Sequence, residues 1–314
     1  MIRRPLPGTI RHAAVLLSLL WCVQSGAEAN TAANSAANSA ANTTVSAVDD
    51  GDHRITLPSP ATRIISLAPH ITELLYAAGA GSAVVGVSTW SDYPPAAEKL
   101  PVVADGARLE LERIIDLQPD LVIAWKSGSS ARQVARLRKL GLVVFESEPR
   151  SFEDIARSLE RFGTLAGSPE GKKAAVSFRE RLQELRGQYS GRRKISVFYQ
   201  IWPSPLMTLN GKHMVTDALR LCGATNIFAS VQQLAPTVSQ EAVVTANPDA
   251  IILTDERSTA ADRWRRLSSM KAVSHNNLFS VNGTLMNRAG PRILEGTAQL
   301  CERIDTARKR LTAD

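Results

Sequence analysis

The sequence predicts an α/β protein in which two open-sheet α/β domains are joined by a single long linking helix. Three observations support this prediction: a helix–strand unit that recurs half a chain apart, the apolar character of its strands, and a long amphipathic segment between the two copies. The first copy is LERIIDLQPDLVI at 111–123, and the second is QEAVVTANPDAIIL at 240–253. A solenoid would need three or more short repeats, so one distant repeat indicates two similar domains.

The two copies align at their Pro-Asp dipeptides. When Pro119 is placed on Pro248, Glu112 falls on Glu241. Apolar residues at helical spacing, an acid in the first turn and the closing proline predict a short helix in each copy. The apolar run that follows is typical of a strand in a parallel sheet that is buried on both faces. The alternative is coincidence, because Pro-Asp before a strand is common in α/β proteins.

The start of the chain has the features of a secretion signal. Early arginines precede an apolar run at 13–23 that is too short to span a bilayer, and Ala27-Glu28-Ala29 fits a small-x-small cleavage site. We therefore expect residues 1–29 to be a signal peptide, cleaved after Ala29, and the mature protein to be exported. A lipid anchor at Cys22 would require small residues before that cysteine, and Leu20-Trp21 does not supply them.

The composition is that of an ordinary globular protein, with 44% hydrophobic and 21% charged residues in 314. No basic tract stands out, so we expect no nucleic-acid partner. Cys222 and Cys301 are the two cysteines outside the signal. In an exported protein such a pair indicates a disulfide, and two buried free thiols are the alternative.

The remaining elements follow in chain order. Residues 30–52 carry a small polar AANS repeat, which predicts a disordered tether with order beginning near His53. Apolar runs and periodicities then predict, around the first copy, strand 63–67, helix 71–78, strand 83–89, helix 130–140, strand 142–146 and helix 152–166. Around the second copy they predict strand 194–201, helix 214–221, helix 264–270, strand 278–281 and helix 291–311.

The longest predicted helix lies between the two halves. Ser168 is a suitable N-cap, Pro169 suits the first helical position, and apolar residues from Phe178 to Tyr189 recur at helical spacing. We assign residues 168–190 as the linking helix, 53–167 as the N-terminal lobe and 191–314 as the C-terminal lobe. An ordinary crossover helix inside one domain is the alternative.

Three of the four tryptophans outside the signal come directly after predicted strands, namely Trp90, Trp125 and Trp202. Ligands of open α/β sheets bind outside the carboxyl ends of the strands, so these rings predict a cleft for a ligand with a large flat face. Closure of the core by an aromatic residue is the alternative. The fourth, Trp264, lies on a predicted helix and is assigned to packing.

The sequence lacks several common motifs of catalytic and metal sites. GxSxG, HExxH, CxxC, P-loop and GxGxxG patterns are absent, and the five histidines show no metal-ligand spacing. His70, just after the first strand, could ligate a metal, but a lone histidine more often caps or packs the following helix. We therefore expect a protein that is not an enzyme and carries no cofactor.

Several segments resemble a known family. SLAPHITELLYAAG, GVSTWSDYPP, LERIIDLQPDLVIAW, LCGATNIF and NRAGPRI are similar to segments of periplasmic binding proteins with a helical backbone. These proteins serve ABC importers of cobalamin, haem and ferric siderophores, and the likeness is greatest to members that bind cobalamin. The resemblance runs from about His53 to the C-terminus and implies a monomeric receptor that delivers its ligand to a dimeric transmembrane importer.

The resemblance also implies roles for particular residues. Trp90, Trp125 and Arg288 match the family's ligand contacts, and Met207 and Thr284 stand where the family has a phenylalanine and an aspartate. With Trp202, these residues form the expected ligand site.

Two further positions depart from the family pattern, because Gly106 and Ala235 stand where tryptophans are expected. Haem or a ferric siderophore is therefore the alternative ligand, for which Tyr93 or His70 could be an axial ligand. Glu112 and Glu241 match the acids that dock onto arginines of the importer, and complementing their own helix dipoles is the alternative.

Overall fold

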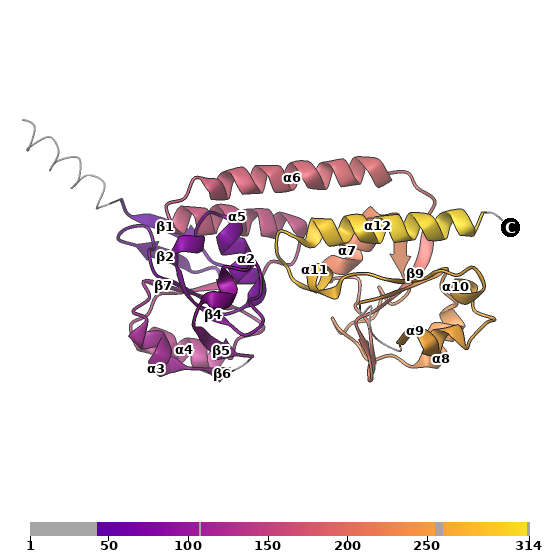
Figure 1. Cartoon of the computed structure of the whole chain (residues 1–314), viewed down its shortest axis with the longest axis horizontal. Helices are drawn as coiled ribbons and strands as arrows, with labels where there is room; N and C mark the ends of the chain where they lie inside the picture. The colour runs from indigo at the N-terminus through magenta and orange to yellow at the C-terminus, as the bar shows by residue number, and fades with distance from the viewer. Residues whose placement is uncertain (1–42, 107, 255–259, 313–314) are drawn as a thin grey trace, which may run out of the picture. The chain divides into compact units, whose positions relative to one another are not determined.

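The computed structural model describes residues 43–106, 108–254 and 260–312, and it contains two separate parallel sheets (Figure 1). The first has six strands in the order β6-β5-β4-β3-β7-β8, and the second has four in the order β12-β9-β13-β14. Only the edge pair β5–β6 is antiparallel within these two sheets. The predicted α/β class with two open sheets is therefore confirmed. None of the helices described is both long and apolar enough to cross a bilayer.

Strands and helices alternate through the first sheet. Its elements are β3 (Ile64–Ser66), α2 (Pro69–Ala77), η1 (Gly81–Ala83), β4 (Val84–Ser88), η2 (Ala97–Lys99), β5 (Val102–Asp105), β6 (Arg108–Leu109), α3 (Leu111–Asp116), β7 (Leu121–Trp125), α4 (Ala131–Lys139), β8 (Val144–Ser147) and α5 (Phe152–Leu165). Four consecutive residues of β7, 121–124, are buried, which is the pattern expected for a strand covered on both faces. The sequence did not predict the short edge strands β5 and β6.

A hairpin precedes the first sheet, formed by β1 (Val45–Val48) and β2 (Arg54–Leu57). Its turn is held by buried Asp49, which accepts hydrogen bonds from the backbone N–H groups of Gly51 and His53 at 2.8 Å each. Ordered structure therefore begins before His53, within the segment that we expected to be a tether. The short alternation in VSAVDDGDHRIT carried too few apolar residues to indicate it. The expected signal peptide and residues 30–42 lie outside the described residues.

Helix α6 (Glu170–Tyr189) follows the first sheet in the chain and packs along α5, with further contacts to α2, α7 and α12 (Figure 1). Its buried apolar face includes Phe178 and Tyr189, as the sequence predicted. The helix begins one residue later than expected, with Pro169 at the N-cap, and the Ser168 hydroxyl accepts the Glu170 N–H at 3.3 Å. One cluster of buried apolar side chains runs without interruption from the α5–α6 pair to α7 and α12.

The second sheet and its helices follow α6. Their elements are β9 (Ile195–Gln200), β10 (Trp202–Pro203), β11 (Leu206–Met207), α7 (Met214–Leu221), β12 (Ala224–Asn226), α8 (Gln240–Ala246), β13 (Ala250–Leu253), α9 (Ala260–Arg265), α10 (Lys271–Ser274), β14 (Leu278–Ser280), α11 (Gly283–Asn287) and α12 (Ile293–Arg310). The helix predicted at 264–270 lies earlier, as α9. Trp264 is fully buried there and donates its indole N–H to Gln200 Oε1 at 2.8 Å, so its packing role is confirmed.

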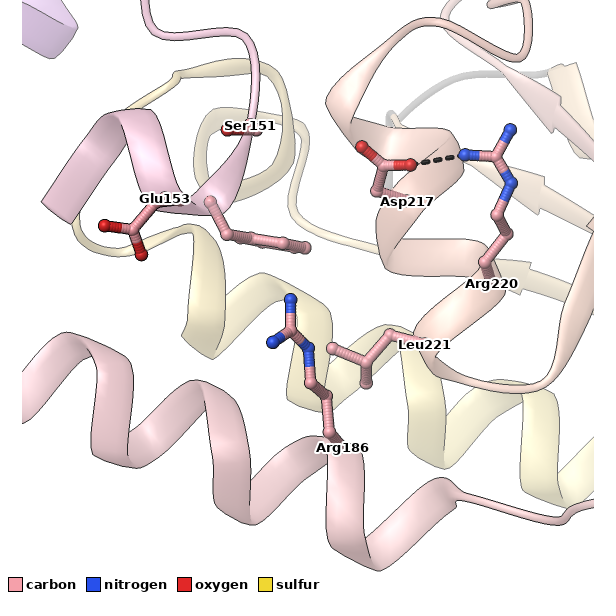
Figure 2. Close-up of a pocket in the computed structure, with 7 residues that line it drawn as sticks. Ser151, Glu153, Arg186, Asp217, Arg220 and Leu221 are labelled. Carbon is pink, nitrogen blue, oxygen red and sulfur yellow. Dashed lines mark hydrogen bonds and ion pairs between the residues drawn. The ribbon is translucent and has the colours of Figure 1, made fainter. Parts of the chain in front are cut away.

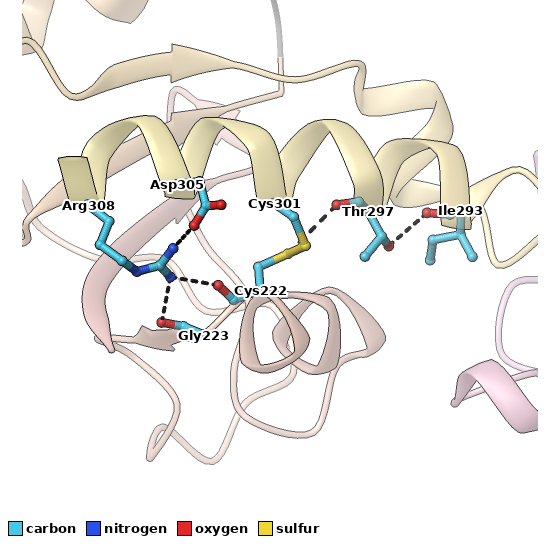
Figure 3. Close-up of a disulfide and its surroundings, with 7 residues drawn as sticks. All are labelled: Cys222, Gly223, Ile293, Thr297, Cys301, Asp305 and Arg308. Atoms are coloured by element: carbon cyan, nitrogen blue, oxygen red, sulfur yellow. Dashed lines mark hydrogen bonds and ion pairs between the residues drawn. A yellow bond between two sulfur atoms is a disulfide. The ribbon is translucent and has the colours of Figure 1, made fainter. Parts of the chain in front are cut away.

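The disulfide between Cys222 and Cys301 is present, which confirms the predicted pairing (Figure 3). It joins the end of α7 to the middle of α12, with the two Cα atoms 4.7 Å apart. Arg308, two turns further along α12, donates to the carbonyl oxygens of Cys222 at 2.9 Å and Arg193 at 2.7 Å. A covalent bond and a guanidinium thus hold α12 to the same corner of the second sheet.

The repeated unit has the same structural basis in both halves. The Asp120 carboxylate accepts hydrogen bonds from the backbone N–H groups of Thr62 and Arg63, at 2.8 and 3.1 Å, just before β3. The Asp249 carboxylate accepts the N–H and hydroxyl of Ser196 on β9, both at 2.8 Å. In each half the aspartate of the Pro-Asp dipeptide therefore fixes the start of the neighbouring strand, which explains why this dipeptide recurs.

Candidate ligand-binding site

Two of the tryptophans singled out in the sequence lie at one edge of the first sheet. Strand β3 pairs in parallel with both β4 and β7, so the carboxyl ends of these strands lie together. Trp90 follows β4 and Trp125 is the last residue of β7. Their side chains are unusually open for tryptophan, with 77% of Trp90 and 40% of Trp125 exposed. Neither ring closes a core, so the core-closure alternative does not apply to them.

Trp202 occupies a comparable place after β9 of the second sheet. It lies in a two-residue antiparallel pairing in which it is the direct partner of Met207. Its indole N–H donates to the carbonyl oxygen of Ser204 at 2.9 Å, and 58% of the residue stays exposed. The aromatic ring and the neighbouring thioether therefore form one polarizable surface, which suits contact with a flat apolar ligand.

The Trp125 ring is held by two neighbours that the sequence did not indicate. His70, the second residue of α2, meets it edge-on at 5.4 Å between ring centroids. A Cβ placed on Gly128 would lie 1.8 Å from the indole Cε3, so only glycine leaves room for the ring in this position. His70 is buried, and desolvation, followed by the positive charge of Arg288, lowers its pKa from 6.5 to about 4. Its imidazole therefore packs neutral against the ring.

Arg288 joins the segment after α11 to the loop after β4. Its guanidinium donates to Asp92 Oδ1 at 2.6 Å, to Glu73 Oε1 at 3.1 Å and to the carbonyl oxygen of Trp90 at 3.0 Å. Hydrogen bonding by Arg288 is also the main reason that the pKa of the Asp92 carboxyl lies below its usual range. The structure thus joins Arg288 to Trp90 and Asp92 through backbone and carboxylate contacts.

Glu73 is the buried centre of this group. Its side chain is 1% exposed and accepts hydrogen bonds from Arg292 Nε at 2.9 Å and Arg292 Nη2 at 2.7 Å, besides that from Arg288. Arg292 also lies over the Tyr93 ring, 3.7 Å from its centroid. Glu73 was missed in the sequence. The sequence feature that could have indicated it is an acid within the mostly apolar run ITELLYA. Such an acid is expected to be buried, and a buried carboxylate needs cationic partners.

The other positions named from the resemblance differ in exposure. Thr284 lies in α11, where its backbone N–H donates to Asn282 Oδ1 at 2.9 Å and its side chain faces solvent. Gly106 has a backbone φ of +53° in an exposed turn, and no atom lies within 4 Å of where its Cβ would be. Ala235 is half-buried beside Leu234, which is 52% exposed. Tyr93 is 41% exposed, whereas His70 is only 6% exposed.

Two cavities lie away from these residues. One of about 390 Å³ is formed by the start of α5 with α6 and α7, and its lining includes Arg186 and the ion pair of Asp217 with Arg220 (Figure 2). The other, about 350 Å³, is formed by α2, α5, α6 and the start of α12. None of the expected ligand contacts lines either cavity. Both belong to the helical layer and not to the strand ends.

The paired glutamates occupy matching places in the two halves. Glu112 is exposed in the first turn of α3 and Glu241 in the first turn of α8. Figure 1 shows both helices on the side of the sheets away from α6. Hydrogen bonds from its own backbone N–H and from the Ser239 hydroxyl hold the pKa of Glu241 below its usual range. Glu241 therefore also complements its own helix start.

Comparison with known proteins gives consistent matches. A family model described as periplasmic binding protein matches residues 64–283. A vitamin B12-binding protein of Vibrio cholerae serotype O1 is 40% identical over 254 residues, covering 80% of this chain and 92% of that protein. The crystal structure of the periplasmic vitamin B12 binding protein BtuF of Vibrio cholerae matches with a TM-score of 0.75 and 39% identity, covering 80% of this chain and 99% of that chain. The periplasmic heme-binding protein RhuT from Roseiflexus sp. RS-1, at 22% identity and a TM-score of 0.69 over 79% of this chain and 99% of that chain, shares the fold.

Proposed function

The chain belongs to the periplasmic binding protein family, and we propose that it is a receptor that captures cobalamin or a related corrinoid and delivers it to an ABC importer. The observation that carries the proposal is the set of three exposed tryptophans at strand ends, Trp90, Trp125 and Trp202. Large exposed aromatic rings at such positions are typical of a binding surface and are costly to leave in water without a function.

The ligand would lie between the strand ends of the two sheets. Trp90 and Trp125 offer rings from the first sheet, while Trp202 and Met207 offer a ring and a thioether from the second. Thr284 supplies an exposed hydroxyl for a polar substituent of the ligand. Arg288, from the segment after α11, lies beside this set through its hydrogen bond to the Trp90 carbonyl. A corrin ring suits these contacts because it is large, flat and edged with amides.

Delivery would use the face that carries α3 and α8. We propose that Glu112 and Glu241 dock onto cations of the transmembrane dimer, one half of the receptor to each subunit, with the receptor acting as a monomer in the periplasm. Both carboxylates are exposed, as docking requires. The proposed lobes at 53–167 and 191–314 each contain one of these acids, and residues 168–190 would link them after export and cleavage at Ala29.

A visible absorption spectrum of protein purified from the periplasm is the first test. A bound corrinoid gives an absorption pattern distinct from that of haem, and colourless protein can then be titrated with cyanocobalamin by calorimetry. Saturable 1:1 binding that weakens when Trp125 is replaced supports the proposal. Absence of heat with cyanocobalamin, together with clear binding of hemin, would replace it with the alternative.

Haem or a ferric siderophore is the second candidate ligand. The specific observation in its favour is Tyr93, three residues after Trp90, which is 41% exposed and whose ring lies under Arg292. A phenol oxygen in that place could ligate iron, whereas His70 would first have to leave its buried contact with Trp125. The relatives are binding proteins, and we propose that this chain likewise has no enzymatic activity and needs no cofactor.

A further inference from the structure

Arg288 uses nearly all of its hydrogen-bonding capacity within the protein. A guanidinium has five N–H donors. Nη1 donates to Glu73 Oε1 at 3.1 Å and Asp92 Oδ1 at 2.6 Å, and Nη2 donates to the Trp90 carbonyl at 3.0 Å and Asp92 Oδ2 at 3.2 Å. Only the Nε donor has no partner among the described residues. The side chain is 17% exposed, so little of it is open to a ligand.

Trp90 needs an external support for its conformation. Its backbone φ is +65°, in the left-handed region that a bulky residue rarely adopts and that persists only where the surroundings impose it. With 77% of the residue exposed, its own packing cannot fix the ring. The flanking backbone is tied within the first sheet by Thr89 N–H to the Ala104 carbonyl at 2.8 Å. The Trp90 carbonyl itself is held by Arg288 from the other half of the chain.

The position of Arg288 is fixed in turn by Glu73. This carboxylate is buried on α2 and is clamped by two N–H groups of Arg292. Gly290 lies against it so closely that an added Cβ would be 3.2 Å from Glu73 Oε2. A charged group this enclosed and this fully paired has one stable arrangement, so it sets where the 288–292 segment meets the first half.

We propose that Arg288 is a positioning residue that acts on the ligand through Trp90, by holding the Trp90 carbonyl and thereby directing its ring. This inference deepens the proposed function and rests on it, because the effect on ligand affinity presupposes that cobalamin binds. It differs from the direct ligand contact that the family resemblance implies. Arg288 and Arg292 of the second half would then fix the position of Trp90 in the first half, through their contacts with Glu73 and Asp92.

A double-mutant cycle distinguishes the two roles. Cyanocobalamin affinity is measured by calorimetry for wild type, Arg288→Ala, Trp90→Ala and the double variant. If Arg288 acts through Trp90, its removal weakens binding about tenfold in the wild-type background and less than about twofold once Trp90 is absent, because coupled residues are not additive. Equal losses in both backgrounds would assign Arg288 a direct contact and overturn the proposal.

A second experiment, fluorine NMR of the tryptophan side chains, needs no ligand. The exported protein is labelled with 5-fluorotryptophan, and the Trp90 fluorine resonance is identified by its loss in Trp90→Phe. Arg288→Ala and the milder Asp92→Asn should both move or broaden that resonance while the buried Trp264 resonance stays in place. Arg186→Ala, which removes an exposed arginine on α6, is the matched control and should leave both unchanged.

The two arms separate the possible failures. If wild type does not bind cyanocobalamin but the Trp90 resonance still responds to Arg288→Ala, the ligand proposal fails and the positioning role stands. If wild type binds and the Trp90 resonance does not respond in either variant, the positioning role fails. A moved Trp264 resonance in Arg288→Ala would indicate a general structural change. The response of the Trp90 resonance to Asp92→Asn, which leaves Glu73 and Arg292 paired, then decides whether the positioning role stands.

Discussion

Acidification from pH 7 to pH 4 should remove about 3 kcal/mol of folding free energy through His70 alone. Desolvation lowers the pKa of this buried imidazole to about 4 in the folded protein, against 6.5 for an exposed histidine. Between about pH 6.5 and pH 4, the unfolded chain binds a proton at His70 that the folded chain does not bind. Stability is therefore fully present above about pH 6.5 and falls as pH approaches 4, and this pKa difference corresponds to about 3 kcal/mol.

The assay is urea unfolding at several pH values between 7 and 4. His70→Leu removes the titrating group and keeps an apolar contact for Trp125, so its free energy of unfolding should depend less on pH than that of wild type. Burial also lowers the pKa of His213, the N-cap of α7, to about 4. His70→Leu should thus remove only about half of the histidine-dependent loss.

His213→Asn is the matched control, because asparagine can also accept the hydrogen bond from Val215 N–H that His213 Nδ1 accepts at 3.1 Å. It should remove the other half of the pH dependence, and the double variant should be nearly flat between pH 7 and about pH 5. A slope for His70→Leu that equals the wild-type slope would show that the buried imidazole does not titrate as argued, and would refute the reasoning.

Three further predictions address other parts of the molecule. Cys222→Ala with Cys301→Ala should lower the free energy of unfolding by about 4–5 kcal/mol, because the disulfide joins cysteines that are 79 positions apart in the sequence. Urea unfolding measures this loss, and an unchanged unfolding midpoint would show that the disulfide does not stabilise the fold. Trp125→Ala should weaken cyanocobalamin binding by about 1–3 kcal/mol in calorimetry, as for an aromatic anchor that the ligand covers. Glu112→Ala with Glu241→Ala should leave ligand affinity intact but abolish importer binding and uptake.

The docking test needs controls for charge and for helix capping. Glu180→Ala removes an exposed glutamate of α6, on the other side of the sheets, and should transport normally. Glu241→Gln keeps a group that can accept the Ser239 hydroxyl but removes the charge, so it should impair uptake under docking and not under capping. Reversal of both acids to lysine should be worse than alanine. Normal uptake by the double alanine variant would exclude a docking role.

The elements predicted most accurately from the sequence are those with a strong local pattern. Helix α7 was placed at Met214–Leu221 without error, and α6 was placed within one residue because its buried face repeats over 20 residues. The hairpin of β1 and β2 was missed because its stability comes from distant contacts. Asp49, for example, also accepts the backbone N–H of Glu146 at 3.2 Å, almost a hundred residues away in the chain.

In the candidate site, too, the residues with a local sequence pattern could be predicted and those that depend on distant contacts could not. The exposed tryptophans could be found because a strand end is visible in sequence and an aromatic residue directly after it is conspicuous. The contact of Arg288 with Glu73 could not be found, because it joins residues 215 positions apart and neither side chain has a local pattern that names its partner. Arg288 was named from the family resemblance, but its hydrogen bond to the Trp90 carbonyl could be found only in the three-dimensional structure.

The acidic residues of the repeated unit differ in how far the fold explains them. The aspartates at 120 and 249 are accounted for by the fold, since each carboxylate fixes the start of the neighbouring strand. The fold does not explain Glu112 in this way, because α3 has no side-chain cap and this residue is exposed. Glu241 is explained in part, because it complements the start of α8. A role in capping alone would therefore predict a stability cost at Glu241 and none at Glu112, whereas docking predicts equal transport defects at both, and single alanine variants measured for both properties separate the two.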